Sequence, residues 1–415
     1  MKILWIVNKI FPYPSKKLGL NENVFGGWLQ GLADNLIQEE NINLTIATVY
    51  KGNKLLSFND GKIEYYLIPG FPATKYNKTY EEYWKIIKNK VKPDIVHIHG
   101  TEYAHGLAFL KACPEVKSVV SIQGLISICA NVYYGNINMS DIIKNITIRD
   151  ILKHDSIIQQ KQKFEKRGKY EIETIKRANA VIGRTTWDFA NVKTINPNIK
   201  YYVGNETLRA EFYKNKWDIK NIERDTIFCS QAGYPIKGFH YLLKTLYFLK
   251  NIKPQIKLYV GGPNITDTKS LKSRIKRSGY GKYISKLIKE YGIQDNIIFL
   301  GLLNEQEVIK RLLKTNVFVL PSAIENSSNS LAEAMILGIP CVASNTGGTT
   351  DMLENKKEGF IYPYTEPGMC AQYILKFLND DNLCVQYGEN ARNTALVRHN
   401  PKENVKQILS IYKDR

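Results

Sequence analysis

Two glutamates eight positions apart, Glu325 and Glu333, are the residues whose types and spacing best suggest chemistry in this chain. Glu325 follows a short apolar run at 317–320, and Glu333 lies inside the helix predicted over 329–337. Because helical side chains lean toward the N-terminus of their helix, Glu333 can reach the mouth of the loop that holds Glu325. Two carboxylates placed in this way can accept hydrogen bonds from ribose and sugar hydroxyls. For an isolated pair, a solvated loop residue beside a surface helix residue is the simpler interpretation.

The start of the same helix offers a site for an anion. The backbone N–H groups near Ser328, Asn329 and Ser330 have no partner within the helix, and the helix dipole favours negative charge there. Lys237, which directly precedes Gly238 and a predicted amphipathic helix, can neutralise a bound diphosphate. The alternative for Lys237 is an ordinary surface lysine.

The elements that position these residues alternate between strands and helices. The apolar run 317–320 and the segment 340–344 read as buried strands, with the helix over 329–337 between them and the glycine pair at 347–348 after them. This order is the unit of a parallel α/β sheet, whose loops meet at the carboxyl edge where ligands bind.

The stretch PSAIENSSNSLAEAMILGIPCVASNTGG, residues 321–348, resembles the E-x7-E region of retaining glycosyltransferases of family 4. The matching features are Pro-Ser before the first glutamate, Glu-Ala-Met at the second, G-x-P-x-V-A-S in the next strand, and the paired glycines. The resemblance extends more weakly over nearly the whole chain. Two further segments, RTTWD at 184–188 and NETLRAEFY at 205–213, resemble the capsule or surface-polysaccharide branch of the family.

The resemblance implies the GT-B fold, an α/β architecture of two Rossmann-like domains facing an interdomain cleft. A chain of 415 residues is also too long for one typical core. We expect residues 1–213 to form the acceptor-binding domain and residues 214–398 to form the domain that binds the nucleotide sugar. We expect the helix in the tail, 399–415, to pack back on the first domain.

Two segments of the first domain carry further candidates for the site. The glycines Gly26 and Gly27 precede a predicted helix, and in the resembled family this loop contacts acceptor and donor; an ordinary turn is the alternative. The segment DIVHIHG at 94–100 places His97 and His99 on one face of a strand. His99, at the carboxyl end, is the candidate for the cleft, whereas His97 is expected to be a hydrogen-bonded structural residue.

The chain departs from the family pattern at two positions. Gln123 stands where many members have a histidine close to the donor sugar, and a glutamine can hydrogen-bond but cannot act as a base. The family segment G-R-x4-K-G is represented only by Lys237 and Gly238, so the phosphate-binding arginine is missing. Gln231 or a basic residue elsewhere could take its place.

The implied reaction is sugar transfer with retention, from a nucleoside-diphosphate sugar to a glycan or a polyprenyl-diphosphate-linked acceptor in bacterial surface polysaccharide synthesis. The family is thought to use front-face attack, with the leaving diphosphate helping to deprotonate the acceptor. The expected catalytic residues are Glu325, Lys237, Gln123 and His99. No cofactor or metal is expected, because no D-x-D pair suited to one is present. Another GT-B enzyme, such as a sugar-nucleotide epimerase, and a non-catalytic sugar-nucleotide-binding protein stay open as alternatives.

The formal net charge of +19 bears on partners rather than on fold. No nucleic-acid-binding motif appears. The basic stretch 150–177 is able to lie on an anionic membrane surface, and a solvated helix face is the alternative. Six cysteines without metal-ligand spacing and the lack of a signal segment favour a cytoplasmic enzyme, with peripheral attachment to the inner face of the plasma membrane left open.

Overall fold

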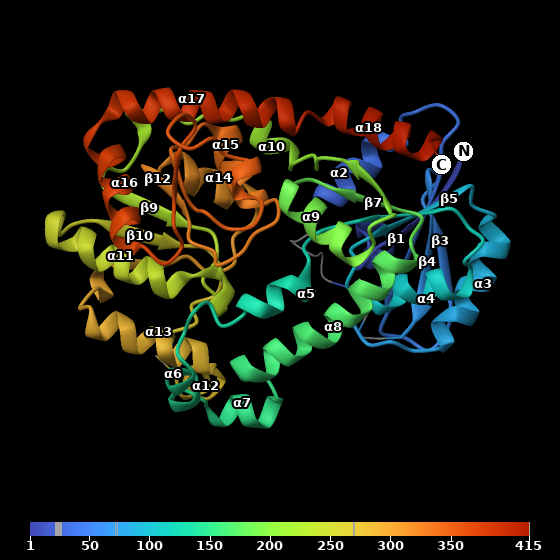
Figure 1. The fold of residues 1–415 in the computed structure, drawn as a ribbon, viewed down its shortest axis with the longest axis horizontal. Coiled ribbons are helices and arrows are strands. Elements are labelled where there is room, and N and C mark those ends of the chain that lie inside the picture. The colour runs from blue at the N-terminus through green and yellow to red at the C-terminus, as the bar shows by residue number, and fades with distance from the viewer. Residues whose placement is uncertain (21–26, 71, 73, 269, 415) are drawn as a thin grey trace. The chain divides into compact units, whose positions relative to one another are not determined.

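The computed structural model describes the chain except residues 21–26, 71, 73, 269 and 415. The chain divides into two compact units (Figure 1). The first unit consists of Met1–Ile128, Phe164–Arg209 and His399–Arg415, and the second of Cys129–Lys163 and Ala210–Arg398. Residues 129–163, which the sequence-based division assigned to the first domain, therefore belong to the second unit. The chain passes from one unit to the other four times.

The first unit is built on an eight-stranded sheet in the order β3-β4-β2-β1-β5-β6-β7-β8. All neighbouring strands are parallel except the β3–β4 pair, which is antiparallel. The strands are β1 (Lys2–Ile6), β2 (Asn43–Tyr50), β3 (Leu56–Asn59), β4 (Ile63–Pro69), β5 (Ile95–His99), β6 (Ser118–Ser121), β7 (Ala180–Gly183) and β8 (Lys200–Val203). The chain builds outward from β1 in one direction and from β5 in the other, so the strand order reverses between these two strands.

Helices cover both faces of this sheet, which explains why its strands are apolar on both sides. In β1, Leu4 packs in a core with Trp84 of α3 and Phe109 of α4, whereas Trp5 packs in a second core with Leu29 of α2. The helices that lie wholly in this unit are α1 (Pro12–Lys17), α2 (Gly27–Leu36), α3 (Thr79–Val91), α4 (Ala104–Ala112), α9 (Thr186–Ile195) and α18 (Pro401–Lys413). Two others, α5 (Ile126–Cys129) and α8 (Ile157–Arg177), cross from one unit to the other.

The C-terminal helix α18 is tied to the middle of the first sheet by one hydroxyl group. The Tyr412 Oη accepts from Trp5 Nε1 at 3.0 Å and lies 2.6 Å from His97 Nδ1. His97 Nε2 lies 2.6 Å from Ser121 Oγ. Burial lowers the pKa of His97 to about 3, so this histidine is a neutral, hydrogen-bonded structural residue.

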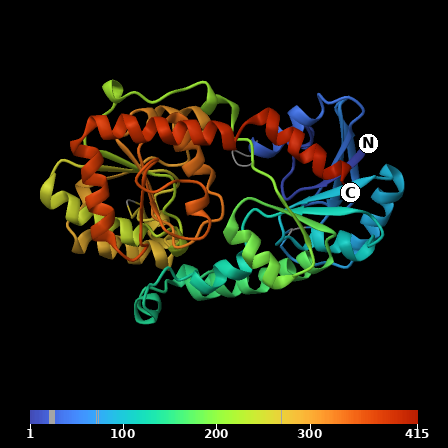
Figure 2. The ribbon, with the colours of Figure 1, turned by 45° about the horizontal axis from the view of Figure 1, so that its top comes forward.

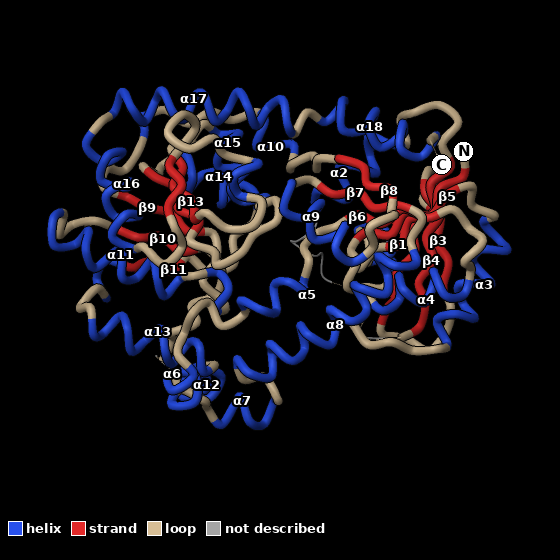
Figure 3. Tube along the Cα trace, in the orientation of Figure 1, coloured by secondary structure: helices blue, strands red, loops and turns tan. Residues whose placement is uncertain are grey.

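The second unit is built on a six-stranded parallel sheet in the order β11-β10-β9-β12-β13-β14 (Figure 3). Its strands are β9 (Thr226–Cys229), β10 (Lys257–Val260), β11 (Ile297–Phe299), β12 (Val317–Leu320), β13 (Cys341–Ser344) and β14 (Phe360–Tyr362). The strand order reverses between β9 and β12. The predicted α/β class is confirmed by both sheets.

The second unit has helices around its sheet and, below them in Figure 1, a separate group of short helices (Figures 1 and 2). They are α6 (Met139–Lys144), α7 (Ile148–Lys153), α10 (Ala210–Tyr213), α11 (Phe239–Ile252), α12 (Leu271–Lys276), α13 (Gly279–Glu290), α14 (Glu305–Leu313), α15 (Asn329–Leu337), α16 (Pro367–Asn379) and α17 (Asp381–Arg398). The strand β12 and the helix α15 have the predicted bounds, and Gly338 ends α15 in the left-handed conformation. Within the described residues, no helix combines the length and apolarity needed to cross a bilayer.

Candidate active site

The loops at the reversal point of the second sheet carry the residues that the sequence singled out. The strands β9 and β12 are neighbours, with Phe318 paired to Phe228. Lys237 lies at the end of the short 3-10 helix Pro235–Lys237 that follows β9, and Glu325 lies in the loop that follows β12. In open parallel sheets, crossovers that leave neighbouring strands in opposite directions create a crevice at this point, and ligands bind there.

Lys237 and Glu325 form an ion pair at this reversal point. The Lys237 Nζ lies 2.6 Å from Glu325 Oε1, and the two side chains are 21% and 13% exposed. Ser322 Oγ donates to the same carboxylate oxygen at 2.7 Å. Burial alone would lower the pKa of Lys237, but the Glu325 carboxylate outweighs it and raises the pKa above its ordinary value. The lysine is therefore a cation, and its charge is paired with the Glu325 carboxylate.

Gly238 holds the loop of Lys237 against the loop of Glu325. Its φ is +68°, and a Cβ there would lie 1.7 Å from the carbonyl oxygen of Pro321. The Ala323 N–H donates to the carbonyl of Ile236 at 2.8 Å, so the two loops are also hydrogen-bonded. The positions of the ammonium and the carboxylate are thus set by direct backbone contact between the two loops.

The glycine pair after β13 supports Glu325 from another direction. Gly347 has a φ of +56°, and a Cβ there would lie 1.9 Å from the Glu325 carbonyl oxygen. The N–H of Gly348 donates to that same oxygen at 2.9 Å. Ser344 Oγ donates to the carbonyl of Ser322 at 2.6 Å. Three neighbouring loops therefore fix the backbone of Glu325.

The first turn of α15 lies directly after the Glu325 loop. Ser328 caps the helix, its Oγ accepting from the Leu331 N–H at 3.4 Å, while its own N–H donates to the Met352 sulfur at 3.2 Å. Helix geometry leaves the N–H groups of Asn329 and Ser330 without an acceptor inside the helix. No acidic residue stands in this first turn, so no negative side chain of the turn competes with an anion. Of the three predicted N–H groups, that of Ser328 already has a partner, although sulfur is a weak acceptor.

Glu333, the second glutamate of the pair, is buried in α15 with 8% of its surface exposed. A buried carboxylate on a helix is costly unless it is hydrogen-bonded or has a ligand. Its burial sets it apart from the surface helix residue that was the simpler interpretation of the sequence.

A segment that the sequence did not connect with this site packs against the loop of Lys237. Gly135 has a φ of +57°, and a Cβ there would lie 2.6 Å from the carbonyl oxygen of Pro235. The Gly135 carbonyl is 2.7 Å from His240 Nε2 and accepts from Tyr364 Oη at 3.0 Å. Burial lowers the pKa of His240 to about 4, so the imidazole is neutral and donates this bond. Gly135 therefore lies directly beside the loop of Lys237.

The first sheet has its own reversal point between β1 and β5, and His99 ends β5 there. His99 is 1% exposed and its ring contacts those of Trp5 and Trp28 at centroid distances of 4.6 and 5.9 Å. Burial, and then the nearby His97 and Arg184, lower the pKa of His99 well below its ordinary value. Within the described part of the chain, neither ring nitrogen of His99 has a hydrogen-bond partner. Since buried polar atoms are normally paired, this neutral imidazole is available to a ligand.

Gln123 follows β6 and is half-buried. Its neighbours on both sides are anchored: the carbonyl of Ile122 accepts from Arg184, and the N–H groups of Ile126 and Ser127 donate to the Glu171 carboxylate at 3.0 and 2.9 Å. Glu171 therefore caps the start of α5 from the basic helix α8, a role that sequence reasoning missed.

The glycine pair of the first domain is only partly described. Gly26 lies outside the described residues, and Gly27 is the first residue of α2. Gln231, considered as a replacement for the missing arginine, is exposed in the loop after β9.

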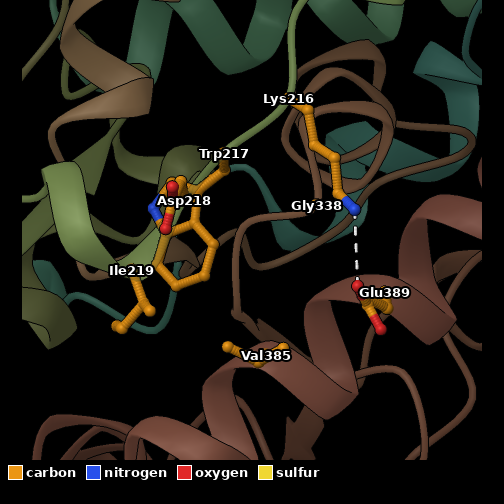
Figure 4. Close-up of a pocket in the computed structure, with 7 residues that line it drawn as sticks. All are labelled: Lys216, Trp217, Asp218, Ile219, Gly338, Val385 and Glu389. Atoms are coloured by element: carbon orange, nitrogen blue, oxygen red, sulfur yellow. Dashed lines mark hydrogen bonds and ion pairs between the residues drawn. The ribbon is translucent and has the colours of Figure 1, made fainter.

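The second unit also has a cavity of about 350 Å³ (Figure 4). It is lined by Lys216, Trp217, Asp218, Ile219, Gly338, Val385 and Glu389. The backbone N–H of Trp217 donates to Leu337 O and its indole donates to Thr315 O, both at 2.8 Å. Leu337 and Thr315 precede β13 and β12, so the cavity lies at the amino edge of the sheet, opposite the loops of Lys237 and Glu325.

Comparison with known proteins relates the second unit to a family of enzymes. Residues 210–394 match the family model described as Glycosyl transferases group 1. The N-acetyl-alpha-D-glucosaminyl L-malate synthase of Bacillus anthracis is 28% identical over 131 residues, which are 32% of this chain and 34% of that protein. The UDP-Gal:alpha-D-GlcNAc-diphosphoundecaprenol alpha-1,3-galactosyltransferase of Escherichia coli is 27% identical over 141 residues, 33% of this chain and 35% of that one. The chain thus spans about a third of the length of these two curated relatives.

The fold as a whole matches solved structures. The sucrose-phosphate synthase of Thermosynechococcus elongatus aligns over 100% of this chain and 99% of that chain, with a TM-score of 0.72 and 15% identity. At this identity the likeness concerns the fold alone. The predicted GT-B fold, with two Rossmann-like units, is confirmed.

Proposed function

We propose that this chain is a retaining glycosyltransferase of family 4 that moves a sugar from a nucleoside-diphosphate sugar to a glycan or lipid-linked glycan acceptor. The observation that carries the proposal is the Lys237–Glu325 ion pair at the reversal point of the second sheet, beside the open first turn of α15. A cation, two free amides and a carboxylate within one crevice are the groups that a diphosphate joined to a sugar requires. Related proteins with such names support the donor and acceptor classes.

In this proposal each group of the second unit has one role. Lys237 leaves Glu325 and binds the diphosphate together with the N–H groups of Asn329 and Ser330. Glu325, freed from Lys237, accepts hydrogen bonds from hydroxyls of the donor sugar. Glu333 accepts from the ribose hydroxyls.

The transfer step breaks the bond between the sugar C1 and the diphosphate oxygen and forms a bond between C1 and an acceptor hydroxyl oxygen on the same face. The acceptor proton passes to an oxygen of the leaving diphosphate. Lys237 and the α15 amides stabilise the charge that develops on this diphosphate, and they do so without a metal ion. Gln123 and His99 are assigned hydrogen bonds to sugar hydroxyls and no role as a base, because Gln123 cannot take a proton and the lowered pKa of His99 makes its imidazole a weak base.

The role of the enzyme is proposed to lie in bacterial surface polysaccharide synthesis, as the RTTWD and NETLRAEFY segments suggest. The experiment that tests the activity begins with a thermal-shift screen of UDP-, GDP- and dTDP-sugars. The selected donor is then incubated with and without a polyprenyl-diphosphate-linked sugar, and the products are followed by NMR. Acceptor-dependent formation of a glycoside with the donor's anomeric configuration is expected. Inversion of configuration, or conversion of the donor without an acceptor, would overturn the proposal.

A further inference from the structure

Large apolar side chains are exposed in two segments of the second unit that the proposed reaction does not use. In α7, Ile148 is 78% exposed, Ile151 62% and Leu152 76%. In α12, Leu271 is 74% exposed and Ile275 65%. Soluble surfaces expose such residues singly, so a cluster of this kind calls for an explanation.

The two segments are neighbours in the fold, near α6 (Figures 1 and 2). Thr147 Oγ1, just before α7, donates to the carbonyl of Arg277, just after α12, at 3.2 Å. Asp150 of α7 accepts from the N–H of Gly279 at 2.7 Å. The helices α7 and α12 therefore form one surface. Its apolar members are Met139, Ile143, Ile148, Ile151, Leu152, Leu271 and Ile275.

The exposed charges on this surface are all positive. Its exposed cations are Lys144, Lys153, Lys272, Arg274 and Lys276. Within residues 139–153 and 270–277 the acidic residues are Asp150, which is 1% exposed and hydrogen-bonded to Gly279, and Asp141, whose side chain is 28% exposed and lies 3.7 Å from Lys286 Nζ. We name the apolar members and these five cations together the apolar–basic surface.

We propose that the apolar–basic surface binds the face of an anionic lipid bilayer. Protruding isoleucines and leucines can enter the interfacial region of a bilayer, while lysines and arginines beside them contact anionic headgroups. A second copy of this chain is disfavoured, because a two-fold contact would bring the same cations against one another. The binding partner must offer an apolar interior beneath a negatively charged surface, and an anionic bilayer has both.

The basic helix α8, which the sequence suggested as a membrane contact, fits this role less well. Its Lys163 is paired with Asp155 at 3.2 Å, and its Arg177 with Glu173 at 3.0 Å. None of the exposed large apolar side chains in the described residues belongs to α8. The mixed charges and the missing apolar side chains favour a solvated face for α8.

The test is co-sedimentation of the full chain with vesicles of phosphatidylglycerol and phosphatidylcholine, and with vesicles of phosphatidylcholine alone. One variant combines Ile148→Ser, Ile151→Ser and Leu152→Ser. Its matched control combines Ile252→Ser, Leu302→Ser and Val397→Ser, which change equally exposed apolar residues elsewhere in the same unit.

A charge variant complements the apolar one. It combines Lys153→Glu, Lys272→Glu and Lys276→Glu, and its control combines Lys220→Glu, Lys244→Glu and Lys310→Glu, which are also exposed. Circular dichroism and thermal melts establish that all variants fold.

The wild type and both controls are expected to sediment with anionic vesicles at low salt, and less so at high salt. Each cation lost from the apolar–basic surface should weaken the partition about fivefold, and the apolar variant should lose most of its binding. The proposal is overturned if wild-type protein stays in solution with anionic vesicles, if the surface variants bind like their controls, or if light scattering shows that the apolar substitutions dissociate a dimer. The readout needs no donor or acceptor, so its outcome is independent of the transfer activity.

Discussion

Neutralising Glu325 separates two roles that a carboxylate can have beside a diphosphate. Lys237 donates to Glu325 at 2.6 Å, so a diphosphate that binds the lysine must compete with this carboxylate. A hydrogen bond between charged groups contributes about 1.5–3 kcal/mol, which corresponds to roughly a tenfold to hundredfold change in affinity. Glu325→Gln should therefore bind UDP about tenfold more tightly, because the competing negative charge is gone. UDP has no sugar, so it makes no sugar contact with residue 325 that the substitution could remove.

The same substitution should have the opposite effect on the sugar part of the donor. If Glu325 accepts hydrogen bonds from sugar hydroxyls, Glu325→Gln should reduce the ratio of the affinity for the UDP-sugar to the affinity for UDP. Sugar transfer should also slow. Lys237→Gln should weaken UDP and UDP-sugar alike, by tenfold or more, because both contain the diphosphate.

Isothermal titration of UDP and of the selected UDP-sugar against the two variants measures these four effects. The control is Lys244→Gln, which changes an exposed lysine on α11 of the same unit. Unchanged UDP affinity in Lys237→Gln would refute the diphosphate assignment. An equal loss of UDP and UDP-sugar affinity in Glu325→Gln would refute the sugar assignment.

Four further outcomes are expected. Glu333→Gln should weaken UDP about tenfold but leave pyrophosphate binding unchanged in titration calorimetry, and equal losses would contradict a ribose contact. Gly347→Ala should lower the unfolding free energy by about 2 kcal/mol or more in chemical denaturation and should slow transfer, because the new Cβ meets the Glu325 backbone and the φ is positive. Gly233→Ala, which has open space around it, should do neither. Burial raises the pKa of Glu171 to about 7 from its ordinary 4.5. The unfolding free energy of the wild type, relative to that of Glu171→Gln, should therefore fall by about 3 kcal/mol as the pH rises from 4.5 to 7, and then level off. Urea titrations measure this difference, and a difference that does not change with pH would contradict the shift. Dialysis against EDTA should leave the transfer rate unchanged, because Lys237 and the α15 amides neutralise the diphosphate, and a loss that Mg²⁺ restores would contradict this.

Elements with a strong periodic pattern could be predicted from the sequence almost to the residue. The strand at 317–320 and the helix at 329–337 have the predicted bounds, since each is an apolar run or periodic segment between turn residues. The short strand Leu56–Asn59 was missed, because four residues at the edge of a sheet carry too little alternation to be recognised. The short helix α6 was missed for a similar reason, since six residues make fewer than two helical turns.

Residues that act through tertiary contacts could not be found from spacing. The sequence singled out Lys237 and Glu325 separately, yet it contains nothing that states that they are paired, because 88 positions separate them and only the strand order makes them neighbours. Glu171 stands among lysines and arginines, in a stretch for which a solvated helix face was one of two interpretations, although it is fully buried and caps α5. Gly135 is likewise in the left-handed conformation where it packs against Pro235, a residue 100 positions later in the chain.

The interleaved connectivity of the units has a practical consequence for engineering. The family match covers 210–394, which invites exchange of that stretch between related proteins, under the proposed function to change the sugar donor. Such a graft would omit residues 129–163, and with them the Gly135 carbonyl that His240 and Tyr364 contact beside Lys237. A functional hybrid should therefore carry residues 129–163 and 210–394 from the same parent. Exchanging both stretches should change donor specificity, whereas exchanging 210–394 alone should not.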